Sequence, residues 1–195
     1  MQDGINSNAN IAFNSNYNNY TYMYYTNSQA KTTLESWYQT NIGSKANLAK
    51  NVAIGAYYCE QAKAKVDDSW TSGSATMTTY NKYTPDFKCS SDGNGKGIVN
   101  TDVGLLSYDE VVYAGGYYNR KSNYNYYLYN SKIHWWTMSP AGFSGSYSNV
   151  WRVTTTGNIL FDVNNYYAIR PVLILNADTK VSDGDGTKNS PFVVE

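Results

Sequence analysis

The chain has 195 residues, enough for one domain with its own core, and its 15 basic and 15 acidic side chains cancel to a formal net charge of zero. Nucleic acids and anionic membranes usually bind clusters of Lys and Arg, so these scattered charges argue against both partners. The unusual feature is 21 Tyr beside abundant Asn, Ser, Thr and Gly, a composition typical of extracellular β-rich domains and binding loops.

The first 26 residues are polar and rich in Asn and Tyr, and we expect them to belong to the same domain as residues 27–195. Alternation at residues 20–24 predicts one short strand after a loop. The sequence begins without the basic and apolar regions of a signal peptide, so any targeting or anchor segment is expected to lie outside it. No stretch approaches the roughly 18 consecutive apolar residues of a membrane span.

Two helices are predicted from capping signals and spacing. Ser28 suits the N-cap of the first helix, in which apolar side chains recur at helical intervals, and Gly43 suits its end. The second helix is expected at about residues 108–114, because Ser107 and Glu110 form a capping-box pattern before an apolar pair.

The middle of the chain predicts a strand at residues 52–59, a polar and turn-rich segment, and a short extended piece at residues 103–106. Cys59 and Cys89 could close a loop of about 30 residues, or could remain two buried thiols. Two Cys and one His without closed spacing do not predict a zinc site, and the glycine-rich SSDGNGKG loop lacks the ligand pattern of a calcium loop.

The apolar part between residues 133 and 175 is expected to organise the fold. IHWWTMSP, VWRV and ILFDV are rich in strand formers and separated by turn residues, which predicts an antiparallel meander. Trp135 and Trp136 are adjacent and point to opposite faces, so we expect one in the core and the other facing outward. The apolar run 169–175 suits a central strand, although Pro171 removes one ladder donor.

Several motifs follow one another in a distinctive order: AYYCEQ, FKCS, VGLLSYDEVVYAGG, YYLYN, WWTMSP, VWRV and the ending IRPVLILNADTKVSDGDGTKNSPFVVE. From about residue 13 onward, this order resembles an uncharacterised family of bacterial surface domains that is common in gut Firmicutes. The resemblance implies export and a location outside the cell or on the bacterial cell surface. Two Cys-containing motifs recur in that family, which implies that Cys59 and Cys89 form a disulfide.

Two helices and a late meander are also similar to the C-type-lectin-like fold in its formylglycine-generating-enzyme variety. This resemblance implies a single α+β domain with twisted antiparallel sheets and two helices, and a fold by itself does not establish a function. The Glu-Pro-Asn or Gln-Pro-Asp and the Trp-Asn-Asp motifs of calcium-dependent sugar-binding lectins are absent. No Cys follows Cys89, whereas those enzymes carry a late copper-binding pair, so neither activity is expected.

No catalytic residue, metal site or cofactor is predicted. The sole His, His134, could act as a general base only beside a nucleophile, and the sequence contains no recognisable Ser or Cys nucleophile motif. Asp109 and Glu110 are explained by capping and by the dipole of the helix that they begin. Arg170 interrupts an apolar run, so we expect its guanidinium to pair within the structure, with Asp109, Glu110 or Asp162.

Recognition is the chemistry that remains, because Tyr offers a large contact area and a hydroxyl group while Asn and Ser adapt their hydrogen bonds. Any single Tyr could instead pack on the surface of its own domain. We expect ligand contacts mainly in the loops at 141–149 and 164–167. The candidate ligand-binding residues are Tyr117, Tyr118, Tyr126, Phe143, Tyr147, Asn149, Asn165, Tyr166 and Tyr167.

These observations predict a non-enzymatic, exported cell-surface domain that binds an extracellular glycan or protein. One alternative is a structural surface or pilus-associated module without a dedicated ligand. Another is a diversified receptor of a diversity-generating retroelement, whose variable proteins use the lectin-like fold and vary late Tyr- and Asn-rich positions. An exposed aromatic patch would favour binding over the structural alternative.

Overall fold

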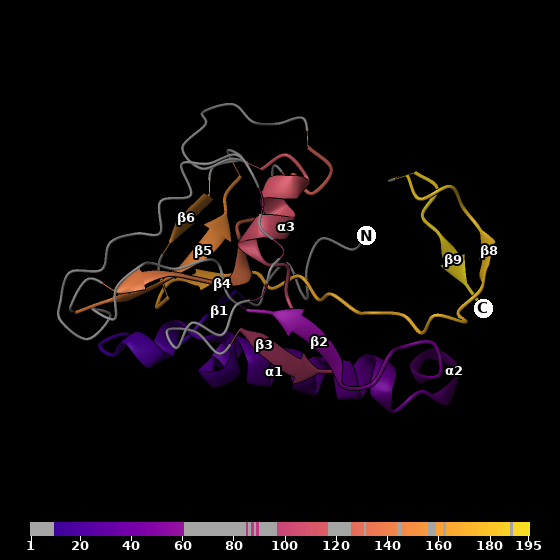
Figure 1. The fold of residues 1–195 in the computed structure, drawn as a ribbon, viewed down its shortest axis with the longest axis horizontal. Coiled ribbons are helices and arrows are strands. Elements are labelled where there is room, and N and C mark those ends of the chain that lie inside the picture. The colour runs from indigo at the N-terminus through magenta and orange to yellow at the C-terminus, as the bar shows by residue number, and fades with distance from the viewer. Residues whose placement is uncertain are drawn as a thin grey trace.

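The structure, a computed structural model, describes residues 10–60, 85, 87, 89, 97–116, 126–130, 132–143, 146–155, 159–161, 163–187 and 189–195, with the backbone alone for 159–161. Over these ranges the chain forms short helices and short antiparallel sheets (Figure 1). This is the α+β class that the sequence predicts. Residues 156–157, the turn residues expected between VWRV and ILFDV, lie outside the described residues.

Both predicted helices are confirmed. In α1 (Gln29–Tyr38) the Ser28 side chain accepts a hydrogen bond from the Lys31 amide, as its N-cap position requires. In α3 (Tyr108–Tyr113) Ser107 and Glu110 form the complete capping box. The helical elements besides these are the 3₁₀ turns η1 (Tyr20–Met23) and η2 (Tyr25–Asn27), the π-helical η3 (Gln39–Gly43) and α2 (Ala46–Ala49).

The strand predicted at residues 20–24 is wrong, because η1 occupies this place. The Asn19 side chain accepts a hydrogen bond from the Thr21 amide at 2.9 Å, which starts a turn instead of an extended strand. The alternating pattern misleads here, since Met23, Tyr24 and Tyr25 are consecutive and all buried.

The predicted late meander is confirmed. β4 (Trp135–Phe143), β5 (Ser148–Val153) and β6 (Ile159–Phe161) form one antiparallel sheet in the order β4-β5-β6. The register of β4 against β5 shifts on both sides of Pro140, since proline cannot donate to the ladder. The other sheets pair β1 (Ile11–Ala12) with β7 (Tyr166–Tyr167), β2 (Ala56–Cys59) with β3 (Ile98–Thr101), and β8 (Val181–Asp183) with β9 (Val193–Val194).

The strand predicted at residues 52–59 is confirmed in its second half, as β2. Gly55 has a φ of 62° and Val52 makes only an isolated bridge, to Leu175. A positive φ is left-handed backbone that breaks a strand, so β2 begins after the glycine.

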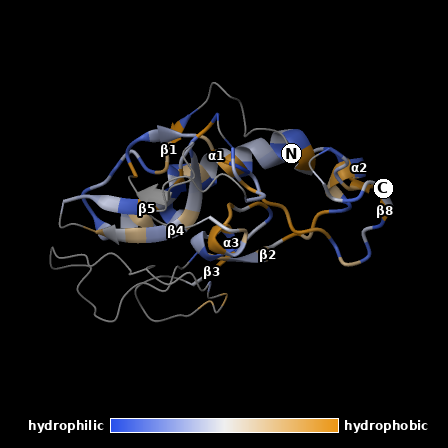
Figure 2. Cartoon of the chain, turned by 90° about the horizontal axis from the view of Figure 1, so that it is seen from above, coloured by the Kyte–Doolittle hydropathy of each residue, from blue (hydrophilic) through white to orange (hydrophobic). Residues whose placement is uncertain are grey.

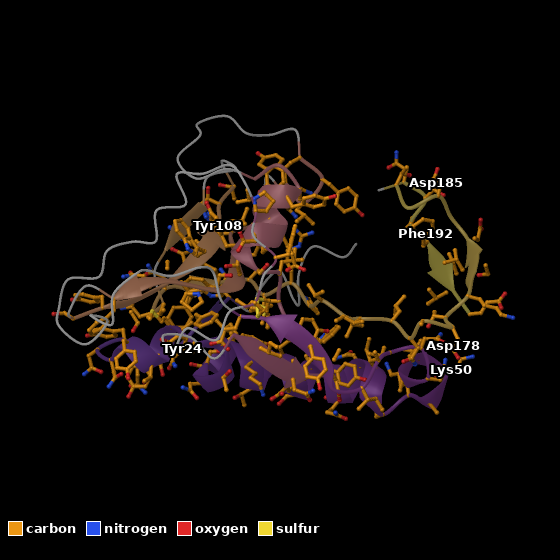
Figure 3. The ribbon with its side chains drawn as sticks, viewed as in Figure 1. Tyr24, Lys50, Tyr108, Asp178, Asp185 and Phe192 are labelled. Carbon is orange, nitrogen blue, oxygen red and sulfur yellow. A yellow bond between two sulfur atoms is a disulfide. The ribbon has the colours of Figure 1, made fainter. Side chains whose placement is uncertain are left out.

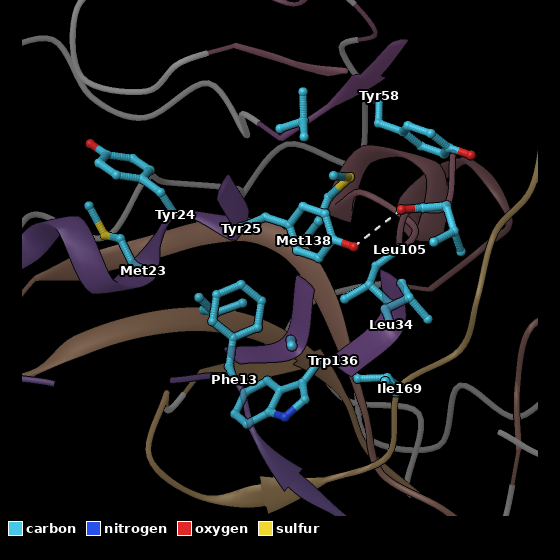
Figure 4. Close-up of a cluster of buried hydrophobic side chains, with 14 of the residues drawn as sticks. Phe13, Met23, Tyr24, Tyr25, Leu34, Tyr58, Leu105, Trp136, Met138 and Ile169 are labelled. Carbon is cyan, nitrogen blue, oxygen red and sulfur yellow. Dashed lines mark hydrogen bonds between the residues drawn. The ribbon is translucent and has the colours of Figure 1, made fainter. Parts of the chain in front are cut away.

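β4 lies between two hydrophobic cores, and all nine of its residues are buried. Trp136 belongs to the first core (Figure 4), and Trp135 to the second. Both indoles are fully buried, at 0% exposure, so they do point to opposite faces, but the expectation that one faces outward is wrong. The first core includes Phe13, Met23, Tyr24, Tyr25, Leu34, Tyr38, Tyr58, Leu105, Met138 and Ile169, and the second Tyr108, Val111, Val112, Tyr126, Leu128, Trp151, Val153 and Ala168.

The central strand predicted at residues 169–175 is also wrong. The segment is extended, but its ladder contacts are single bridges, such as that of Val172 with Gly104. It begins in the core at Ile169, with 1% exposure, and reaches the surface at Leu175, with 45% exposure. Pro171 breaks the ladder, and the apolar run leads away from the sheets toward β8 (Figure 2).

The β8–β9 hairpin stands apart from the other sheets (Figure 1). Every residue of its two strands is exposed, and Figure 3 shows Asp185 and Phe192 on it, well away from Tyr108. Its base is attached at Asn51, whose side chain donates to the Glu195 carbonyl. The Thr179 hydroxyl donates to the Asn51 carbonyl at 3.2 Å.

Cys59 and Cys89 are joined by a disulfide that links Cα atoms 5.6 Å apart. The bond ties the end of β2 to a position 30 residues later. The sequence allows either a disulfide or two free thiols, and the structure contains the disulfide.

Two leucines on helices provide a matched test of where the core lies. Leu34 is fully buried in the first core, whereas Leu48 on α2 is 42% exposed. We expect Leu34→Ala to lower the free energy of unfolding by about 2–5 kcal/mol, and Leu48→Ala by less than about 1 kcal/mol, because only the first leaves a cavity. Urea unfolding followed by circular dichroism measures both, and equal losses would contradict this assignment of the core.

The disulfide should stabilise the fold through its 30-residue separation. The chain-entropy model gives about 3–4 kcal/mol for a loop of this length. We therefore expect a Cys59→Ser/Cys89→Ser variant to lose about that much free energy of unfolding in urea. A reducing agent should destabilise the wild type and leave the double variant unchanged. Wild-type protein that is insensitive to reduction would refute the expected contribution.

Candidate functional site

Two tyrosines stack on each other at the surface beside the β4–β5 connection. The ring centroids of Tyr17 and Tyr147 are 5.0 Å apart, and the ring planes differ by 7°. Tyr17 is 38% exposed and Tyr147 51%. Nearly parallel rings at this separation are offset, which is a favoured arrangement for aromatic pairs. Each ring therefore fixes the position of the other while part of each stays open to solvent.

Backbone hydrogen bonds hold the two segments of this pair together. The Ser148 amide donates to the Tyr17 carbonyl at 2.7 Å, and the Ser148 hydroxyl donates to the Asn19 carbonyl. Ser148 is only 1% exposed, so these bonds are shielded from water. On the N-terminal side, the Asn14 amide donates to the Val163 carbonyl at 3.1 Å. The position of the pair is thus set by main-chain contacts to β5 and to the segment before β7.

Amide side chains flank the stacked rings. Asn16 and Asn18 are exposed on either side of Tyr17, and Asn149 is partly exposed two residues after Tyr147. The Asn149 side chain donates to the Tyr147 carbonyl at 3.2 Å. We refer to these five residues as the tyrosine platform.

The platform lies in two stretches of sequence that carry no formal charge. Residues 10–30 and 133–151 contain no Asp, Glu, Lys or Arg. An aromatic pair with amide neighbours can offer ring faces and neutral hydrogen-bond donors and acceptors to a ligand. It offers no charge of its own to attract an ion.

A second group of aromatic residues surrounds Tyr167 on β7. The Arg152 guanidinium lies 4.0 Å from the centroid of its ring, and the Trp136 ring packs edge-on at 4.9 Å. The His134 ring is 5.5 Å away. These contacts hold Tyr167 in place, while its neighbour Tyr166 is 65% exposed. Adjacent strand residues point to opposite faces, and Tyr166 has the more exposed ring of this pair.

The surroundings of His134 and Arg170 explain both side chains without a ligand. Burial lowers the pKa of His134 below its ordinary value, and the nearby Arg152 charge lowers it further. The ring is therefore neutral at pH 7. Arg170 is paired within the structure: its guanidinium donates to the Leu128 carbonyl at 2.8 Å and lies 4.8 Å from the centre of the Trp135 ring.

The structure separates the candidate ligand-binding residues into three groups. Tyr126 and Phe143 are 7% and 6% exposed and belong to the two cores, so packing explains both and they are not part of a surface. Tyr117 and Tyr118 lie outside the described residues. The candidates with accessible side chains are Tyr147, Asn149, Asn165, Tyr166 and Tyr167.

Tyr17 is the functional candidate that sequence reasoning missed. It lies about 130 residues before its stacking partner, and only the fold brings the two rings together. Its setting in SNYNN carries the same signal as the late loops, a Tyr surrounded by Asn and Ser. Applying that signal to the N-terminal segment would have found it.

A pocket of about 250 Å³ lies between β2, α3 and the extended segment after β7. Three of its polar side chains, those of Ser107, Glu110 and Tyr58, form hydrogen bonds within the protein. The Glu110 carboxylate accepts hydrogen bonds from the Ser107 amide and hydroxyl at 2.7 and 2.9 Å, and the Tyr58 hydroxyl donates to the Val172 carbonyl at 3.0 Å. Burial raises the pKa of Tyr58 to about 12, so the phenol stays protonated.

Among the residues that the structure describes, no three His, Cys, Asp or Glu side chains gather in a way that could hold a metal ion. Within that part of the chain, none of the helices has the length and apolar character needed to cross a bilayer.

Residues 5–177 match the model of a protein family described as a domain of unknown function (DUF6273). The chain belongs to the DUF6273 family. This agrees with the predicted resemblance to an uncharacterised family. No curated protein and no solved structure matches the chain significantly. The DUF6273 match includes the platform, the disulfide and both cores, and it ends before the β8–β9 hairpin.

The lowered pKa of His134 predicts how acid affects the stability of this DUF6273 chain. In the unfolded chain His134 binds a proton near the ordinary pKa of about 6.5. In the folded chain its pKa is lower, so the proton binds only at lower pH. Stability should therefore fall as the pH drops through about 6.5 toward the folded pKa. His134→Gln removes this contribution, so its melting temperature should fall less between about pH 7.5 and 5.5. Identical pH dependence in both proteins would contradict the partly buried, neutral imidazole.

Proposed function

We propose that this DUF6273 domain is a non-enzymatic binding domain of an exported bacterial surface protein, and that it recognises an extracellular glycan or protein through the tyrosine platform. The observation that supports this most directly is the stacked and exposed pair of Tyr17 and Tyr147. Tyr25 and Tyr108, which pack in the two cores, are each no more than 1% exposed, whereas Tyr17 and Tyr147 stay 38% and 51% exposed. The Tyr17–Tyr147 pair is held at the surface by hydrogen bonds that are shielded from water. Binding of a ligand explains such an exposed pair better than packing does.

An extracellular location is supported by the disulfide and by the composition. Disulfides persist mainly in oxidising compartments, and proteins of the cytosol rarely keep them. The small number of charged residues, 15% of the chain, and the excess of Tyr fit the same setting. We also propose a relationship to the C-type-lectin-like fold, which is supported by a late antiparallel meander accompanied by α1 and α3.

A binding role, rather than a catalytic one, is supported by how the pocket beside α3 uses its polar groups. Ser107 and Glu110 complete the capping box, which satisfies the start of the helix. The Tyr58 hydroxyl fixes the chain at Val172. The sole imidazole, His134, is packed against Tyr167 and lies outside this pocket.

A screen of glycan arrays and arrays of extracellular proteins tests the proposed function. Tyr147→Ala should weaken binding to any ligand found by about tenfold or more, because it removes one of the two stacked rings. Tyr113→Ala is the matched control, since Tyr113 on α3 is 75% exposed and distant in sequence from the platform. Surface plasmon resonance measures the affinities.

Tyr166→Ala in the same screen reports whether the binding face reaches β7. A ligand whose affinity survives both Tyr147→Ala and Tyr166→Ala would show that the assigned face is wrong. The absence of any ligand in both arrays would favour the alternative of a structural surface module.

A further inference from the structure

We infer that the ligand of the tyrosine platform is a neutral carbohydrate, bound by stacking of a sugar ring on the tyrosine pair and by hydrogen bonds to amide side chains, without a calcium ion. This inference rests on the binding function proposed above and names the class of its ligand. The ligand class named is a neutral glycan, as opposed to a charged glycan or a protein.

The charge of the surface is the first argument. The two stretches that form the platform, residues 10–30 and 133–151, lack every formally charged side chain. A site for a sulfated, sialylated or phosphorylated ligand needs Arg or Lys to replace the water lost by the anion. A basic ligand would need carboxylates for the same reason. An uncharged ligand needs no such countercharge, and its hydroxyls need only hydrogen bonds.

The shape of the surface is the second argument. Protein partners are usually anchored by side chains that enter well-packed pockets. The pocket described beside α3 is lined by other residues, such as Tyr57, Glu110 and Val172, and by none of the platform. The platform offers ring surface instead, on two tyrosines that stack on each other and remain 38% and 51% exposed. The apolar C–H face of a pyranose ring matches an aromatic face in size and chemistry.

The hydrogen-bonding groups are the third argument. Sugar hydroxyls both donate and accept, and the amide of Asn offers both functions in one side chain. Asn16 and Asn18 are exposed beside Tyr17, and Asn149 is partly exposed beside Tyr147. Carboxylates are the usual ligands of a calcium ion, and neither stretch contains one. Amides and ring faces are therefore the groups that would hold the sugar.

Affinity electrophoresis of the intact chain in gels that contain polysaccharide tests this inference. The neutral probes are galactomannan, β-1,3-glucan, arabinoxylan and yeast mannan, and the anionic probes are polygalacturonate, heparin and chondroitin sulfate. We expect retardation by at least one neutral probe, unchanged by EDTA. Because no charge is involved, high salt should leave it unchanged as well. Isothermal titration with oligosaccharides of the same polymer then gives the affinity.

Four variants locate the interaction. Tyr17→Ala and Tyr147→Ala should each weaken binding to the neutral probe by about tenfold or more, since each removes a stacking face. Tyr147→Phe keeps the ring and should stay within about threefold of the wild type. Tyr57→Ala is the control, because Tyr57 is 72% exposed on β2, beside the other pocket. Circular dichroism confirms that each variant is folded.

The outcomes distinguish this inference from the proposed function. Retardation by anionic probes alone, or binding abolished by EDTA, would overturn the neutral, metal-independent ligand. A neutral ligand unaffected by Tyr17→Ala and Tyr147→Ala would overturn its placement on the platform. If only a protein ligand is found and Tyr147→Ala weakens it, the binding function survives and the carbohydrate class is wrong. If no ligand of any kind is found, both fail.

Discussion

The burial of β4 on both faces is the constraint on which the rest of the structure depends. A strand that faces water on one side needs apolar residues only at alternate positions, but this strand places adjacent indoles into separate cores. The Trp136 indole donates to the Ile11 carbonyl at 2.9 Å, and the Thr137 hydroxyl donates to the Trp151 carbonyl at 2.8 Å. These bonds matter because a polar group buried without a partner would oppose the hydrophobic gain. The N-terminal segment and α1 close one side of the strand, and α3 helps to close the other.

The same strand also positions the candidate site. β4 leads into β5, and the first residue of β5, Ser148, binds the main chain at Tyr17 and Asn19. The stacked rings therefore sit where two segments distant in sequence are joined to the central sheet. The two stretches of sequence that carry the rings contain no charged residue and several Asn and Ser, which suits a ligand that water also solvates well. The hydroxyl-rich surface of a carbohydrate fits that description better than an apolar peptide does.

Local signals predicted the elements that local chemistry controls. Ser28, Ser107 and Glu110 mark helix starts by their own hydrogen bonds, so α1 and α3 follow directly from the sequence. The errors arose where tertiary packing decides. Nothing near Trp135 and Trp136 reveals that a second core covers the outer face of β4, and the burial of Tyr126 depends on partners elsewhere in the chain. For the same reason, the late half of the platform could be predicted from its loop, but its pairing with Tyr17 required the fold.

The covalent link between Cys59 and Cys89 has a consequence for how this protein can evolve. It pins both ends of the intervening segment to one place at the edge of β2, whatever the number of residues between them. The entropy of closing a loop grows only with the logarithm of its length, by about 0.6 kcal/mol for each doubling. Insertions and deletions between the two sulfur atoms therefore cost the scaffold little. Changes in the length of this segment should therefore leave the sheet that presents the stacked rings undisturbed.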